Sequence, residues 1–140
     1  MRRFPVAIAL VWAASACGGS EVTNVDLSAD SGIYTLQSMN GSVLPYLIGS
    51  STNYSLTLTA ESIDVGASGA FRDVVALKEI SNGILKVYSD TTSGSWTERG
   101  ALASFTSNEG VVTQGTITGN VLTITGRDQS GAIVVAIYRK

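Results

Sequence analysis

Asparagine and glycine pairs divide this chain at short intervals, and they constrain its fold more than any other feature. Asn40-Gly41, Asn82-Gly83 and Gly119-Asn120 are two-residue hairpin signals, because these residues tolerate the positive φ angles of type I′ and II′ turns. Looser clusters of glycine, serine, asparagine and aspartate lie at 49–53, 66–69, 90–94, 108–110 and 127–131. These turns together predict about nine short strands.

Between the turns, apolar and polar residues often alternate. In the segment YSLTLT, for example, Tyr54, Leu56 and Leu58 share one face of a strand, while the serine and threonines share the other. No segment has the pattern of a capped amphipathic helix. Strands with one apolar face must close on themselves or pair with a second sheet to hide that face.

Short connections favour closure over a sandwich. We therefore predict one all-β domain over residues 32–140, an antiparallel up-and-down β-barrel of about eight to nine strands. A Greek-key sandwich needs longer crossings, for which only 49–53 and 90–94 could serve. The final strand, AIVVAIYRK, is apolar on both faces, so we expect it to be central and to close the barrel against the first strand.

The N-terminal segment has the pattern of an export signal. Two arginines precede an apolar run, Phe4 to Ala14, which is too short to span a bilayer, and small residues lead to the single cysteine, Cys17. The stretch AASACGGS resembles the lipobox of bacterial lipoproteins. That resemblance implies cleavage before Cys17, a diacylglyceryl group on its sulfur and further acylation of its amino group. Without lipidation, this odd thiol of an exported protein would be reactive or paired between chains.

The predicted organisation is a signal peptide at 1–16, then Cys17 and a flexible acidic tether to residue 31, and then the barrel. As an alternative for the tether, Val25 and Leu27 could add an edge strand or cap one end of the domain. We expect an exported protein held in a bacterial membrane by acyl chains on Cys17. In a cell with two membranes, Gly18 after the cysteine favours the periplasmic face of the outer membrane.

Charge argues against nucleic acid as a partner. The chain has 11 acidic and 9 basic residues, and signal cleavage removes Arg2 and Arg3, so the exported part is clearly acidic. Such a surface gives no electrostatic reason to bind phosphates.

A second resemblance concerns the domain itself. The segments SGIYTLQSMNG, GSWTERG, GTITGNVLTITG and the terminal IYRK are similar to those of small lipocalin-like lipoproteins of bacteria. In lipocalins the first strand carries Gly-x-Trp, and an arginine of the last strand packs over that indole. The matching positions are Gly32, Tyr34 and Arg139, with tyrosine in place of tryptophan. The resemblance implies a calyx-shaped barrel and, in some members, a small apolar ligand.

Catalysis has few candidate residues. The chain has no histidine and its only cysteine is expected to carry lipid, which removes the usual nucleophilic triads and transition-metal sites. We therefore expect no enzyme, metal or cofactor. The remaining option is a carboxylate pair converging in a cleft. Its candidates are Glu61, Asp64, Asp73, Glu79, Asp90, Glu98, Glu109 and Asp128.

Two binding functions remain open. In the first, the barrel carries or senses a small apolar ligand, with Tyr34, Phe71, Trp96, Phe105 and Arg139 as the candidate lining residues. In the second, the protein is a non-catalytic accessory or structural protein of the envelope, which meets a partner protein through its outer face or a strand edge. Because eight strands enclose little more than their own side chains and many inward positions are leucine, isoleucine and valine, we favour a barrel that the aromatic residues fill, with little or no cavity.

Overall fold

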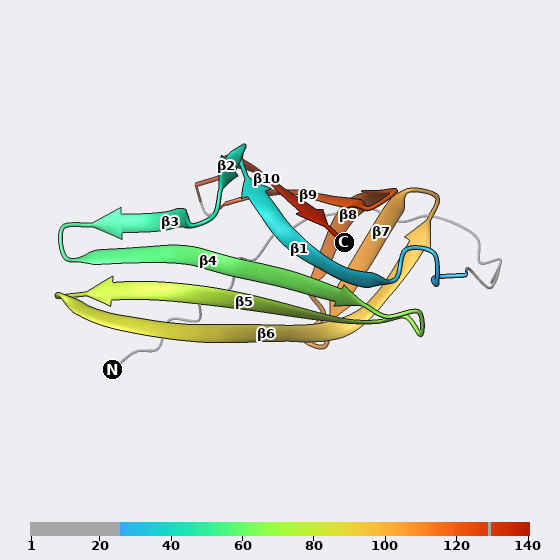
Figure 1. Ribbon diagram of the computed structural model, residues 1–140, viewed down its shortest axis with the longest axis horizontal. Coiled ribbons are helices and arrows are strands. Elements are labelled where there is room, and N and C mark those ends of the chain that lie inside the picture. Colours follow the sequence, from blue (N-terminus) through green and yellow to red (C-terminus); the bar gives the residue numbers. More distant parts are fainter. Residues whose placement is uncertain (1–25, 129) are drawn as a thin grey trace.

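The computed structural model describes residues 26–128 and 130–140, which form ten β-strands (Figure 1). The strands are β1 (Gly32–Met39), β2 (Ser42–Val43), β3 (Tyr46–Ser51), β4 (Tyr54–Val65), β5 (Ala70–Ser81), β6 (Ile84–Arg99), β7 (Leu102–Ser107), β8 (Val112–Thr118), β9 (Val121–Arg127) and β10 (Ile133–Arg139). Within these residues there is no helix long and apolar enough to cross a membrane.

Eight of the strands close into an antiparallel barrel. Its order is β1-β4-β5-β6-β7-β8-β9-β10, and it closes because β1 pairs with both β4 and β10. The short β2 pairs with β1, and β3 pairs with β4, so both extend the sheet outside the ring. The predicted up-and-down barrel is confirmed, as is the closure of the last strand against the first.

Two of the predicted hairpin turns have the backbone that their residues favour. Asn40 and Asn82 have φ angles of 52° and 50°, and the glycine after each has φ 77°. Positive φ at both central positions defines the type I′ turn, whose twist matches that of the flanking strands. The Asn-Gly signals therefore mark real hairpins, between β1 and β2 and between β5 and β6.

The turn predicted at 90–94 is wrong, because these residues lie inside the long strand β6. Their serines and threonines are compatible with a strand, and Gly94 serves close packing instead of a turn. A Cβ at Gly94 would collide with the backbone of Thr106 and would lie 2.9 Å from Cε1 of Phe71. The chain turns later, at Gly100, where φ is 62°.

Side chains fill the barrel. The largest fully buried ones are Trp96, Tyr34, Leu58, Leu122 and Val65, and they belong to a single apolar cluster contributed by strands all around the ring. Burial of such side chains is the main stabilising contribution to a domain of this size.

Three strands are longer than the barrel needs. β4 and β5 have 12 residues each and β6 has 16, whereas β7 has 6 and pairs only with residues 94–99 of β6. We call the projecting part the arm: β3 with residues 54–59 of β4, 77–81 of β5 and 84–92 of β6. Figure 1 shows the arm reaching out to the left of the barrel.

Candidate functional site

Three of the predicted ligand-binding aromatics meet inside the barrel and pack against one another. Phe71 and Phe105 lie edge to face, with ring centroids 5.4 Å apart. The Trp96 ring is stacked on Phe105 at 6.2 Å, and its Nε1 donates a hydrogen bond to the Gly66 carbonyl at 2.8 Å. All three rings are buried. Side-chain contacts therefore occupy the space that a ligand would need between them.

Tyr34, the first-strand aromatic, is fully buried at one end of the barrel. Its hydroxyl donates to the Asp30 carbonyl at 2.9 Å, and Lys140 Nζ lies 5.4 Å from the ring centroid. Arg139 is exposed. The basic residue over the first-strand aromatic is thus Lys140, one position after the predicted one.

The same end of the barrel is covered by the chain that precedes β1. Leu27 packs against the core, and the Lys140 ammonium donates to the carbonyls of Ala29 and Ser31 at 2.9 and 3.2 Å. Residues 26–31, the last part of the predicted tether, therefore lie against the barrel, which corresponds to the alternative that Leu27 caps the domain.

An acidic pair lies at this capped end. Burial, together with the neighbouring Asp30 carboxylate, raises the pKa of Glu98 to about 7, while Lys140 lowers it. Burial also raises the pKa of Tyr34 to about 12, and the charges of Asp30 and Glu98 add to this effect. Glu98 thus holds a proton more tightly than an exposed glutamate does.

A second acidic pair, Glu61 and Asp73, lies on the inner wall. Both side chains are partly buried, and the buried Tyr138 hydroxyl donates to Glu61 Oε1 at 2.6 Å. Burial, followed by the charge of Glu61, raises the pKa of Asp73 to about 7. Burial also raises the pKa of Glu61. It raises the pKa of the Tyr138 hydroxyl well above its usual value.

Glu61 and Asp73 are two of the eight candidate carboxylates, but it was not predicted from the sequence that they lie close together. Within the described part of the chain, Asp73 Oδ1 is buried and has no hydrogen-bond partner. The sequence did contain a signal. Glu61 lies at every-second-residue spacing from Ile63 and Val65, and Asp73 from Phe71, so both acids share a strand face with buried apolar side chains. Two adjacent acids of this kind can share a proton near neutral pH. If both carboxylates are charged at this buried position, the folded state is less stable.

Two hollows lie on the outside of the sheet. One is lined by Leu102, Gln114, Gly115, Thr116, Thr123 and Thr125. The other lies beside the end of the arm and is lined by Thr91, Thr92, Ser93, Ser107, Asn108 and Glu109. Both are open and shallow, unlike the enclosed pockets that hold small ligands. Among the residues with described positions, no three or more histidine, cysteine, aspartate or glutamate side chains cluster as metal ligands.

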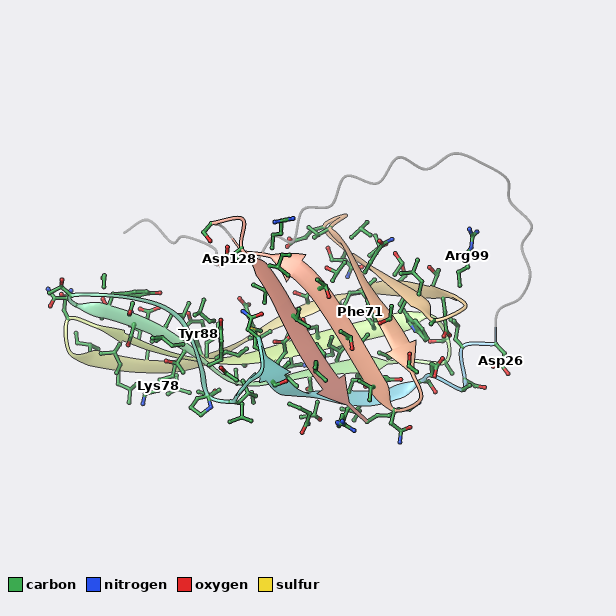
Figure 2. All side chains as sticks on the ribbon, turned by 90° about the horizontal axis from the view of Figure 1, so that it is seen from above. Asp26, Phe71, Lys78, Tyr88, Arg99 and Asp128 are labelled. Atoms are coloured by element: carbon green, nitrogen blue, oxygen red, sulfur yellow. The ribbon has the colours of Figure 1, made fainter. Side chains whose placement is uncertain are left out.

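The arm has a different surface from the barrel. All nine residues 84–92 of β6 are exposed, and none of the described strands pairs with their outer side, so we call this stretch the β6 edge. Apolar side chains stand on it: Ile84, Leu85 and Val87 are 63%, 56% and 71% exposed. Figure 2 shows Tyr88 on the arm, away from the barrel residue Phe71.

Backbone groups add to this exposure. The carbonyl of Ser93, just past the edge, accepts a hydrogen bond from Asn108 N on the β7 side, and Trp96 N donates to Gly69 on the β5 side. Because these groups alternate along a strand, the odd-numbered residues of the β6 edge direct their N–H and C=O away from β5. The β6 edge therefore presents unpaired backbone groups together with apolar side chains, the combination that another strand can use.

Cys17, the signal peptide and most of the predicted tether lie outside the described residues. The predicted export and the lipid anchor on Cys17 therefore stay predictions. No family model, curated protein or solved structure matches this chain.

Proposed function

We propose that this chain is a lipid-anchored accessory protein of the cell envelope, which binds a partner protein by adding a strand to its β6 edge. The observation that carries the proposal is the β6 edge itself. Unpaired edges are normally blocked by charges, proline or a covering segment, because they invite pairing. Here the edge runs for nine residues, has no proline or covering segment among the described residues, and carries Ile84, Leu85 and Val87 beside two charges of opposite sign, Lys86 and Asp90.

The packing of the barrel interior also favours binding of a partner protein over carriage of a small apolar ligand. A carrier for a small apolar ligand needs an internal cavity that reaches the barrel mouth. Trp96, Phe105 and Phe71 instead pack against one another, and Leu27 covers one end of the ring. Binding through the arm needs no such cavity. Strand addition supplies affinity through backbone hydrogen bonds and specificity through alternate side chains.

Site-specific photo-crosslinking tests this function. A photoreactive amino acid is placed at Val87 in the full-length exported chain, and the matched control carries it at Ile133, which is 59% exposed on the barrel. We expect a crosslinked product from Val87 whose peptides map to a strand of the partner, and none from Ile133. Equal products from both positions, or none from either, would contradict the proposal.

The anchor is tested separately. Cleavage before Cys17 and acylation of its sulfur and amino group predict a mature chain whose N-terminal peptide carries the mass of the acyl chains. Mass spectrometry of that peptide measures this directly. A Cys17→Ala variant should lose the added mass and leave the membrane fraction, and an unmodified Cys17 in the parent chain would overturn the anchor.

A further inference from the structure

The β6 edge has a feature that points to its partner: its sequence, ILKVYSDTT, is complementary to itself in the antiparallel direction. We propose that two copies of this chain pair through their β6 edges, antiparallel, about a two-fold axis at Tyr88. The inference rests on the proposed function, because it names the partner that adds the strand.

Backbone geometry restricts the registers that such a pair can use. Residues that direct their N–H and C=O outward must lie opposite each other, because such a pair exchanges both hydrogen bonds. On the β6 edge these are the odd-numbered residues. A two-fold axis must therefore pass through a residue and not between two residues.

Charge then selects one residue for the axis. With Tyr88 on the axis, Lys86 of each copy lies opposite Asp90 of the other, and two opposite-charge pairs form. An axis through Val87 or Ser89 leaves both charges opposite uncharged residues. An axis through Lys86 or Asp90 places like charges face to face. Opposite charges directly across an antiparallel pair stabilise it, and like charges destabilise it.

The Tyr88 register also places these charges where they interact best. Lys86 and Asp90 are even-numbered, so they would form non-hydrogen-bonded pairs, in which the side chains approach most closely. Within one copy, the residue opposite Asp90 on β5 is Val75, which cannot neutralise it. A second copy would bring Lys86, which lies opposite Glu79 on its own β5, to the other side of Asp90.

On the other face of the sheet, Leu85 and Val87 lie beside Ile80, which is opposite Leu85 on β5. This gives an apolar strip at the end of the arm. In the Tyr88 register, Leu85 and Val87 of one copy lie opposite Thr91 and Ser89 of the other, and the two Val87 side chains are diagonal neighbours across the axis. Cross-strand packing of such residues contributes to pairing.

The end of the edge has room for the partner's turn. In this register, Gly83 of the second copy comes opposite Ser93, whose carbonyl already accepts a hydrogen bond from Asn108. The ladder between copies therefore stops before Ser93. The open hollow described above lies at this point, between Thr91 and Glu109, and it would accommodate the Asn82-Gly83 turn.

A cysteine scan tests both the partner and the register. Val87→Cys, Tyr88→Cys and Ser89→Cys are made one at a time in the full-length chain, exported to an oxidising compartment. Only Tyr88 faces its own copy, at a separation of about 4.5 Å between Cα atoms, which is within the range of a disulfide. We expect a disulfide-linked dimer from Tyr88→Cys, at least about tenfold above the other two variants and above the parent chain with Cys17 alone.

Charge reversal gives a second, independent readout that introduces no thiol. Lys86→Asp and Asp90→Lys should each weaken the dimer by roughly tenfold, because each creates two like-charge pairs. A mixture of the two single variants restores opposite charges across the axis. Sedimentation should therefore show mixed dimers and few homodimers, and the double variant K86D/D90K should dimerise like the parent.

The outcomes separate this inference from the proposed function. A monomeric chain that still crosslinks from Val87 to a different protein would overturn self-pairing and leave strand addition in place. A dimer linked best through Val87→Cys or Ser89→Cys would overturn the register. A dimer that is insensitive to every change on the β6 edge would overturn both proposals.

Discussion

The barrel and the arm are built from the same strands, yet they differ in what covers them. In the barrel, β6 has a neighbour on each side, and its inward residue Trp96 is 2% exposed. In the arm, the same strand has one neighbour, and Tyr88, on the same face, is 37% exposed. Alternation alone therefore does not say whether a face is buried. What decides it is how far along the strand a second neighbour extends.

The largest test of this contrast compares two aromatic residues of β6. Trp96→Ala should lower the free energy of unfolding by about 3 to 5 kcal/mol, because it leaves a cavity beside Phe105 and removes the indole hydrogen bond to the Gly66 carbonyl. Tyr88→Ala should cost only about 1 kcal/mol, because Tyr88 is 37% exposed and its removal leaves no enclosed cavity. Urea unfolding measures both changes. Similar losses would mean that the arm is as tightly packed as the barrel.

The next test asks whether water is excluded from the Asp73 carboxylate on the inner wall of the barrel. Because the pKa of Asp73 is raised to about 7 in the folded protein, the folded state binds a proton that the unfolded state releases above about pH 4. Folding stability should therefore fall as the pH rises from about 4 to about 7, by up to about 4 kcal/mol.

Asp73→Asn should reduce this fall, leaving only the part due to Glu61, and stabilise the protein above pH 7, as followed by thermal unfolding across the pH range. Asp64→Asn is the matched control, because Asp64 is exposed on the outside of the same barrel. If the parent and the Asp73 variant gave parallel profiles, water would be reaching the Asp73 carboxylate.

Much of the fold was predictable from local signals. The Asn-Gly pairs require positive φ, and the alternating residues between them require one covered face, so an antiparallel barrel followed from the sequence. The segment 90–94 misled because serine, threonine and glycine also suit a strand that passes close to a neighbour. Only the three-dimensional packing of Gly94 against Thr106 distinguishes the two cases.

The candidate sites were less predictable, because each depends on pairing between distant strands. Glu61 and Asp73 meet because Ile63 lies opposite Asp73 in the β4–β5 hairpin, a register that composition does not reveal. The β6 edge exists because β7 ends its pairing at Gly94. Nothing local to residues 84–92 indicates that their second neighbour is missing.

A smaller effect sharpens the contrast at the hairpin turns. Asn40 and Asn82 have nearly equal φ angles, so Asn→Ala at either position forces alanine into an unfavourable backbone conformation, at about 1 kcal/mol. Asn40 also accepts a hydrogen bond from Val135 N at 2.8 Å, which ties β1 to β10. We therefore expect Asn40→Ala to cost about 1 kcal/mol more than Asn82→Ala in urea unfolding. Equal costs would mean that this contact adds no stability.

The smallest expected change in stability falls on the β6 edge, where the change in binding should be large. Val87→Lys places a charge on an exposed strand edge, so the free energy of unfolding should change by less than about 0.5 kcal/mol. The same charge should hinder another strand from packing there, since lysines on an edge strand are a natural block to edge pairing. Ile133→Lys is the control on the barrel surface, and it should leave both stability and pairing unchanged. Equilibrium unfolding and sedimentation of the two variants measure the two effects separately. A large loss of stability from Val87→Lys would show that Val87 contributes to the fold itself and is not held available for a partner.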